Sequence, residues 1–244
     1  SVIGYKISGV PEGYSLNHGN HLGGGVWSLT AADLAGLKIT APSTFTGTLN
    51  LTATVLSAET TLSGNEASTA DNAAQASAPV VLQWLPIAFP PTVLVNGGVP
   101  NAIVKEDNSI NVPVTATLNA LSSPTSYLTV TVSGISAGWG AFSAPVGTYN
   151  AVTGTWTVTL APGQNLSTAF SFAPNANSDI DPSNLQVTAT AFEPATATSS
   201  NAATAFSVLV DAVADVPTIS ADGAVGNQGT ALNITLGGAV TDLD

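Results

Sequence analysis

The sequence predicts an all-β protein built from tandem β-sandwich domains, and three observations support this fold class. Short runs rich in Val, Ile, Thr and aromatic residues alternate apolar with polar positions, as half-buried strands do. These runs are separated by Gly, Pro, Asn and Ser, which favour turns. The same series of runs occurs twice in the same order, which indicates an internal duplication.

The stretch 206–219 (FSVLVDAVADVPTI) marks the end of one domain and the start of the next. A strand with alternating apolar residues is followed by a short acidic linker, and Pro217 then opens a new strand. The stretch 79–95 (PVVLQWLPIAFPPTVLV) has the same form, with Pro91 in the place of Pro217. The distance between the two prolines fits one β-sandwich. We therefore expect one complete domain at 91–216.

Composition limits the classes of partner. Hydrophobic residues make up 44% of the chain and charged residues only 7%, which is typical of a folded β protein and not of an acidic disordered tail. The net charge is −12, from 15 acidic residues and three lysines. This charge argues against nucleic acid and anionic membrane surfaces as partners. The chain has no cysteine, so disulfides cannot stabilise it.

Residues 1–89 read as the back half of a sandwich repeat. The Gly- and Asn-rich segment 11–25 is expected to be a hairpin or loop, and 31–36 a turn or a single helical turn. The Ala- and Ser-rich segment 58–78 is expected to be a loop, because no apolar residue repeats in it. We expect strands at 2–10, 26–30, 37–40, 48–55 and 80–85.

The complete domain repeats these runs. ISGV (7–10) returns as VSGI (132–135), VWSLT (26–30) as TWTVT (155–159), LKITAP (37–42) as AFSFAP (169–174), and LNLTATV (49–55) as LQVTATA (185–191). Trp27 and Trp156 are equivalent in this alignment, and both are expected to pack in a core. We expect about seven strands in the domain. The core should contain Trp156, Phe170, Phe172, Leu185, Val187 and Val208.

Residues 1–89 contain no counterpart of the front strands of the complete domain. That counterpart stands at 217–244, which aligns with 91–118, so that ALNITLG (231–237) matches SINVPVT (109–115). We therefore expect 217–244 to be the front strands of a further repeat, with neither end of the sequence at a domain boundary. They would complete residues 1–89 of a neighbouring copy, head-to-tail, in a covalent array or by strand addition.

Three segments resemble a known family. ISGVPEGYSL (7–16), VWSLTAADLAGLKITAPSTFTGTLNLTATV (26–55) and VDAVADVPTI (210–219) are similar to the tandem repeats of giant bacterial surface adhesins of the repeats-in-toxin type. The resemblance implies an immunoglobulin-like or cadherin-like sandwich, type I secretion to the bacterial cell surface, calcium at domain junctions, and a role in adhesion or biofilm. Two departures are the turn NHGNHLGGG (17–25), which lacks acidic residues, and the junction 79–91, which also lacks them.

Acidic residues gather in the stretch 211–244. Three lysines cannot neutralise these acids, so a bound cation is one candidate partner. Calcium is the preferred ion, because it binds the oxygen ligands that carboxylates supply. The alternative is a solvated acidic linker. Asp211 and Asp215 would be about 13 Å apart on a straight strand and can share an ion only if the chain bends. The candidate calcium ligands here are Asp211, Asp215, Asp242 and Asp244.

Asp179 and Asp181 form an Asp-x-Asp loop, for which an Asx turn is expected and a metal site is the alternative. A turn is also expected at 106–108, with junction calcium as the alternative. His18 and His21 share one loop with no third ligand nearby, so we expect a solvated pair. Catalysis is not expected, because both histidines lie in that loop and no cysteine is present.

The sequence thus predicts a non-enzymatic, calcium-stiffened structural repeat of an extracellular bacterial adhesin or surface filament. It would bind neighbouring repeats or copies of itself, with head-to-tail polymerisation by strand complementation as one form. A surface glycan or matrix is a further partner class. The alternative function is a calcium-dependent glycan-binding module that uses exposed Trp or Tyr.

Overall fold

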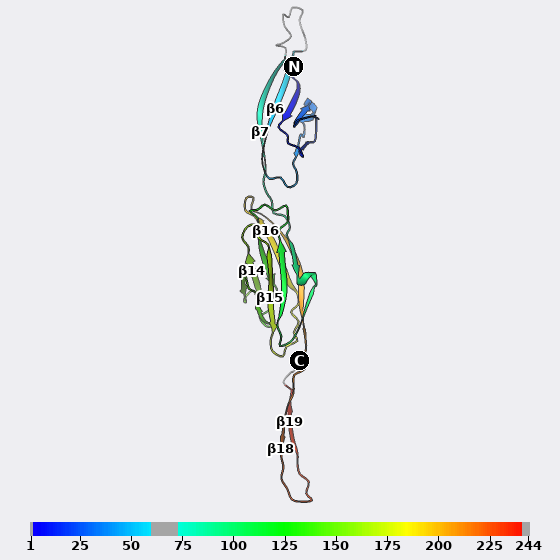
Figure 1. Ribbon diagram of the computed structural model, residues 1–244, viewed down its shortest axis with the longest axis vertical. Helices are drawn as coiled ribbons and strands as arrows, with labels where there is room; N and C mark the ends of the chain where they lie inside the picture. The colour runs from blue at the N-terminus through cyan, green and yellow to red at the C-terminus, as the bar shows by residue number, and fades with distance from the viewer. Residues whose placement is uncertain (1, 60–72, 241–244) are drawn as a thin grey trace, which may run out of the picture. The chain divides into compact units, whose positions relative to one another are not determined.

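The computed structural model describes residues 2–59 and 73–240, and within these ranges it consists of β-strands with two short 3₁₀-helices. The predicted all-β fold class is therefore confirmed. Contacts divide the chain into unit 1, Ser1–Pro86, and unit 2, Ile87–Asp244 (Figure 1). Across the described residues, no helix has the length and apolar character needed to cross a membrane.

Unit 1 contains a five-stranded antiparallel sheet in the order β3-β4-β1-β6-β7, and a two-stranded sheet of β2 and β5. The long strands β6 and β7 pair along their whole length, from Gly47 opposite Trp84 to Ala58 opposite Ala73 (Figure 1). The elements are β1 (Val2–Ser8), β2 (Ser15–Leu16), β3 (Asn20–Gly23), β4 (Val26–Leu29), η1 (Ala31–Leu34), β5 (Ile39–Thr40), β6 (Gly47–Ala58) and β7 (Ala73–Trp84).

The prediction of a loop over 58–78 is wrong for residues 73–78, which form the first half of β7; residues 60–72 of that prediction lie outside the described residues. The side chains of 73–78 are small or polar and exposed, so they leave no apolar period in the sequence. Backbone hydrogen bonds to β6 form this strand without apolar side chains. A hydrogen bond of 2.9 Å between the Thr54 and Ser77 hydroxyls joins the two strands on their surface.

The core of unit 1 is small. Val10, Leu49 and Leu51 are buried, and other apolar residues pack against them while staying partly exposed. Trp27 is one of these, so the expectation that it lies in a core is met only in part. Tyr14 and Phe45 pack edge-on against each other and against Trp84, with ring centroids 5.4–6.1 Å apart. The inner face of the five-stranded sheet is therefore only partly covered.

Unit 2 is a two-layer sandwich. One sheet has four strands, in the order β12-β15-β10-β8, and the other has six, in the order β13-β14-β11-β16-β17-β9. These strands exceed the seven that we expected, because edge strands extend both sheets. Their bounds are β8 (Thr92–Val95), β9 (Asn101–Lys105), β10 (Ile110–Thr117), β11 (Tyr127–Ser133), β12 (Gly140–Ser143), β13 (Thr148–Asn150), β14 (Thr155–Thr159), β15 (Leu166–Pro174), β16 (Leu185–Glu193) and β17 (Thr198–Asp211), with η2 at Asn96–Gly98.

The core of unit 2 lies between its two sheets and contains every residue predicted for it: Trp156, Phe170, Phe172, Leu185, Val187 and Val208 are all buried. The Trp156 and Phe170 rings meet edge-on at 4.8 Å, and the Trp156 Nε1–H donates to the Val146 carbonyl at 2.8 Å. Each such buried apolar side chain contributes about 1.5–3 kcal/mol to folding. The alternation of the sequence was sufficient to identify this core.

The two units repeat the same sheet. The order β3-β4-β1-β6-β7 in unit 1 matches β13-β14-β11-β16-β17 in unit 2. The register also matches, since Ile7 lies opposite Trp27 and Ala53, as Val132 lies opposite Trp156 and Val187.

This register makes Leu51 the equivalent of Leu185, whereas the sequence alignment had paired Leu49 with Leu185. The alignment was thus wrong by two residues along β6. A shift of two keeps each side chain on the same face of a strand, so the apolar pattern could not detect the error.

The chain continues beyond the sandwich into a separate antiparallel hairpin of β18 (Thr218–Asp222) and β19 (Thr235–Ala239) (Figure 1). Every residue of both strands is exposed.

Candidate functional site

Acidic side chains of unit 2 gather at the end of the sandwich where β9 and β17 finish. The two strands run parallel, and Lys105 at the end of β9 lies opposite Asp211 at the end of β17. Glu106 follows β9 directly. The loop between β15 and β16 carries Asp181, whose Oδ1 accepts a hydrogen bond of 2.7 Å from the Val210 amide. The topology thus brings three segments that are far apart in sequence to one end of the domain.

Glu106 is the most buried of these acids, with 1% of its surface exposed. Its backbone amide donates to the Asp211 carbonyl at 3.1 Å, and its Oε1 accepts from the Val213 amide. Its Oε2 is buried and finds no hydrogen-bond partner among the described residues. A buried carboxylate oxygen without a partner costs free energy, so this position favours a bound positive group.

Asp107 binds the loop between β15 and β16 at the same end of the sandwich. Its Oδ1 accepts a hydrogen bond of 3.4 Å from the Asn177 amide, and its backbone has a positive φ of 60° at the turn between β9 and β10. The expectation of a turn at 106–108 is confirmed by the hydrogen bond of 3.2 Å from the Asn108 amide to the Lys105 carbonyl.

The predicted calcium ligands have different outcomes. Asp181 and Asp211 lie at the same end of unit 2 as Glu106, through the Val210 amide and the Asp211 carbonyl, and Asp215 follows in the linker, where it is half-exposed. Asp179 precedes Asp181 in its loop, while Asp242 and Asp244 lie outside the described residues. Within the described part of the chain, no three His, Asp or Glu side chains are arranged to hold a metal ion. The calcium site therefore stays a prediction.

Glu106 was not chosen as a ligand from the sequence, although a signal for its burial exists. Ala102 and Val104 are buried and precede it at a period of two, so Glu106 continues the inward-facing series of β9.

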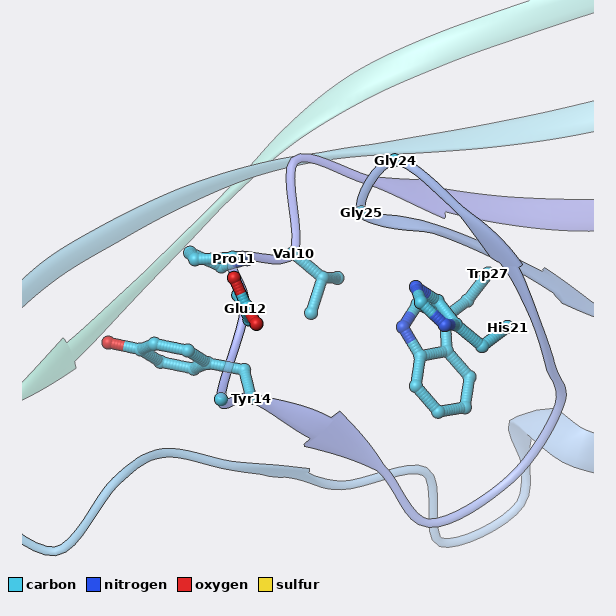
Figure 2. A pocket seen from close by; sticks show the side chains of 9 residues that line it. Val10, Pro11, Glu12, Tyr14, His21, Gly24, Gly25 and Trp27 are labelled. Carbon is cyan, nitrogen blue, oxygen red and sulfur yellow. The ribbon is translucent and has the colours of Figure 1, made fainter.

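A pocket of about 560 Å³ opens in unit 1 beside the Gly-rich turn. Tyr14 and Glu12 lie on one side of it, and Trp27 and His21 on the other (Figure 2). The His21 and Trp27 rings are stacked at a tilt, with centroids 5.1 Å apart. His18 is exposed to solvent. Aromatic rings beside a carboxylate are groups that can bind a sugar, so this pocket is the place where the glycan-binding alternative would apply.

Unit 2 shows what fills the same space in a complete sandwich. The Val10 amide donates to the Gly25 carbonyl at 3.0 Å, as the Ile135 amide does to the Gly154 carbonyl, and this makes Trp27 the equivalent of Trp156. In unit 2 the Trp156 ring contacts Phe170, and Phe142 packs on Phe170 at 5.1 Å. The pocket of unit 1 therefore corresponds to sandwich interior that aromatic side chains occupy in unit 2.

No known protein family and no curated protein matches the chain. The chain is similar to the crystal structure of a collagen adhesin from S. aureus, with 8% sequence identity and a TM-score of 0.26. The alignment covers 98% of this chain and 84% of that chain. At this level the similarity carries no conclusion about function, and the fold assignment rests on the sheets described above.

Proposed function

We propose that this chain is a structural section of an extracellular bacterial adhesin or surface filament, in which tandem β-sandwich repeats act as a spacer. The proposal rests on one observation: the same domain plan occurs along the chain three times, once in full and twice in part. Unit 2 contains a whole sandwich, unit 1 repeats five of its strands in the same order, and a hairpin follows the sandwich within unit 2. Arrays of one repeated domain project a binding region away from a surface.

Calcium would stiffen the array at the acidic end of unit 2. The Glu106 carboxylate would bind the ion, and the side chains of Asp181, Asp211 and Asp215 would turn toward it on binding, because without the ion they form no metal-binding group with Glu106. A divalent cation at this place supplies positive charge to the buried Glu106 carboxylate and ties the linker to the sandwich. The net charge of −12 with only three lysines makes an added cation favourable in general.

The calcium proposal is tested by thermal unfolding in calcium and in chelator. With a Kd of about 10⁻⁴–10⁻³ M, 10 mM calcium should stabilise unit 2 by about 1.4–2.7 kcal/mol and raise its Tm by about 5–10 °C. Glu106→Gln and Asp181→Asn should abolish this rise, and Asp215→Ala should reduce it. Asp222→Asn, in the exposed strand β18, is the matched control and should keep it. No calcium uptake in titration calorimetry at millimolar concentration would refute the proposal.

The spacer role is tested by pulling single chains from both ends. Unit 2 should unfold in one event, at a higher force in calcium than in chelator, because the ion joins β9, β17 and the β15–β16 loop. An unfolding force that is unchanged by calcium would contradict a calcium-stiffened spacer.

Glycan binding is the second candidate function, and the pocket of Trp27, Tyr14 and Glu12 is the observation that favours it. A sugar that binds there should quench Trp27 fluorescence with micromolar affinity, and Trp27→Ala should abolish binding. If no sugar of an array binds, the glycan-binding candidate is rejected and the spacer proposal is unaffected.

A further inference from the structure

Unit 1 presents an open apolar groove of about 470 Å³ on the inner face of its main sheet. Ile7 of β1, Leu51 of β6, and Val80 and Leu82 of β7 line it, and three of these side chains stay partly exposed. Adjacent strands that carry apolar residues on one face require a second layer to cover them.

Unit 2 shows which element covers this face. The residues equivalent to Ile7, Leu51, Val80 and Leu82 are buried there: Val132, Leu185, Phe206 and Val208. Val112 of β10 lies with the last three around a residual cavity of only about 20 Å³. The strand that closes the sandwich is therefore β10, which pairs with β8.

The hairpin β18–β19 has the same construction as β8 and β10. Thr218 lies opposite Ala239 and Ala221 opposite Leu236, as Thr92 lies opposite Thr117 and Val95 opposite Val114. The turn before the second strand is also the same. The Thr230 amide donates to the Asn227 carbonyl at 3.2 Å, as Asn108 does to Lys105, and Gly229 has a positive φ like Asp107.

This equivalence identifies the apolar face of the hairpin. Ile234 and Leu236 take the positions of Val112 and Val114, which are 1% and 0% exposed in unit 2. In the hairpin the same positions are 77% and 66% exposed. Ile219, in the position of Val93, is 81% exposed. The hairpin therefore presents core residues of a sandwich without the sheet that covers them in unit 2.

Charge is compatible between the hairpin and unit 1. The buried Glu106 of unit 2 is replaced by Gln228 in the hairpin. Asp181 and Asp211 are replaced in unit 1 by Gly47 and Leu85, as the strand registers show. A glutamate at position 228 would bury a charge against neutral residues of unit 1, whereas glutamine avoids this cost.

The two attachment points lie at opposite ends of the unit 2 sandwich. The Ala88 amide, next to unit 1 in sequence, donates to Thr198 Oγ1 at the start of β17, and the chain leaves after Asp211 at the end of that strand. Fourteen residues of β17 span about 45 Å, and residues 212–217 reach at most about 20 Å. This arrangement favours a second copy of the chain as the partner of the hairpin.

We infer that the hairpin β18–β19 of one copy completes the sandwich of unit 1 in the next copy. Ile234 enters the groove between Leu51, Val80 and Leu82, and residues 223–227 add in parallel to the edge strand β7, as β9 adds to β17 in unit 2. Within the described residues the hairpin and the groove are different surfaces, so the contact between copies is head-to-tail. This inference deepens the proposed spacer function by naming the partner of unit 1.

The test uses the full chain and two single variants, measured by light scattering after size exclusion. The unmodified chain should form oligomers whose mass rises with concentration. Ile234→Asp places a charge on the apolar face of the hairpin, and Leu82→Asp places one in the apolar groove. Each variant should weaken association at least about 100-fold. Val152→Asp is the matched control, because Val152 is 97% exposed in the turn between β13 and β14, outside both the hairpin and the groove.

An equal mixture of the two variants gives the sharper result. The Ile234→Asp chain keeps its groove and the Leu82→Asp chain keeps its hairpin, so the mixture should form one-to-one dimers and nothing larger. This outcome does not require unit 1 of the Leu82→Asp chain to fold.

Three outcomes would overturn the inference: an unmodified chain that stays monomeric at every concentration, a mixture that stays monomeric, or a Val152→Asp chain as impaired as Ile234→Asp. Loss of assembly with calcium stabilisation intact would reject the inference alone, because the proposed spacer function is tested on unit 2.

Discussion

Glu193 is a carboxylate in the interior of unit 2, with 0% of its surface exposed. It binds the loop before β11 through hydrogen bonds. It accepts hydrogen bonds from Ser126 Oγ at 2.8 Å, from Thr125 Oγ1 at 3.0 Å and from the Ala195 amide at 3.1 Å. Burial acts to raise the pKa of Glu193, but the hydrogen bonds from Ser126, Ala195 and Thr125 together outweigh burial and hold its pKa below the ordinary value.

Glu193 should make the stability of unit 2 depend on acid pH. Because its pKa is lower in the folded than in the unfolded chain, its contribution is fully present above the unfolded value of about 4.3 and is lost as the pH falls through the folded value. Glu193→Gln should cost about 1–3 kcal/mol at pH 7 and flatten this dependence, as urea unfolding at pH 7 and pH 3 can measure. Glu12→Gln, at an exposed glutamate, should change neither. An acid dependence that the Glu193 variant retains in full would contradict this role.

The sequence predicted apolar residues better than buried acids. Trp156 and Phe170 follow the alternation of their strands and were placed correctly. Glu106 and Glu193 also occupy inward-facing positions of their strands. An acidic residue at such a position is normally taken as the end of a strand, and the partners that stabilise these two acids lie far away in the sequence. Only the fold brings Ser126 to Glu193 and Asp211 to Glu106.

At the scale of elements, the turn that precedes β4 and β14 is built in the same way in both units. Gly25 and Gly154 have positive φ values of 73° and 61°. A Cβ atom at Gly154 would lie 2.0 Å from the Ile135 carbonyl oxygen, and one at Gly25 2.4 Å from that of Val10. Both glycines therefore allow two backbone segments to approach closely.

Gly154→Ala should destabilise unit 2 by at least about 2 kcal/mol, because the methyl group meets backbone that cannot move without breaking the turn. Urea unfolding followed by tryptophan fluorescence measures this change. Gly138→Ala is the control, since its Cβ would make only an ordinary contact of 3.6 Å with Ser136. Equal stability of the two variants would show that the turn relaxes freely.

Strands with an apolar period were predictable, and those without one were not. The alternation of β10, β11, β16 and the end of β17 marks a buried face. Residues 73–78 of β7 have no such face, and their pairing with β6 depends on backbone hydrogen bonds that leave no pattern in the side chains.

At the scale of the whole chain, the sequence duplication predicted that 217–244 matches the front of the complete domain. The register of β18 with β19 repeats that of β8 with β10, which the sequence could not establish by itself. Unit 1 and the hairpin are thus two parts of one domain plan.

A permuted chain tests whether the hairpin completes the sandwich of unit 1. Residues 217–244 are placed ahead of Ser1 through a short Gly/Ser linker, so that each molecule carries its own front hairpin before unit 1. We expect a monomer at all concentrations, in which the amides of Val80 and Leu82 in β7 exchange with solvent at least about tenfold more slowly than in an unassembled Ile234→Asp chain. A permuted chain that still polymerises, or whose β7 amides exchange as fast as in that variant, would contradict it.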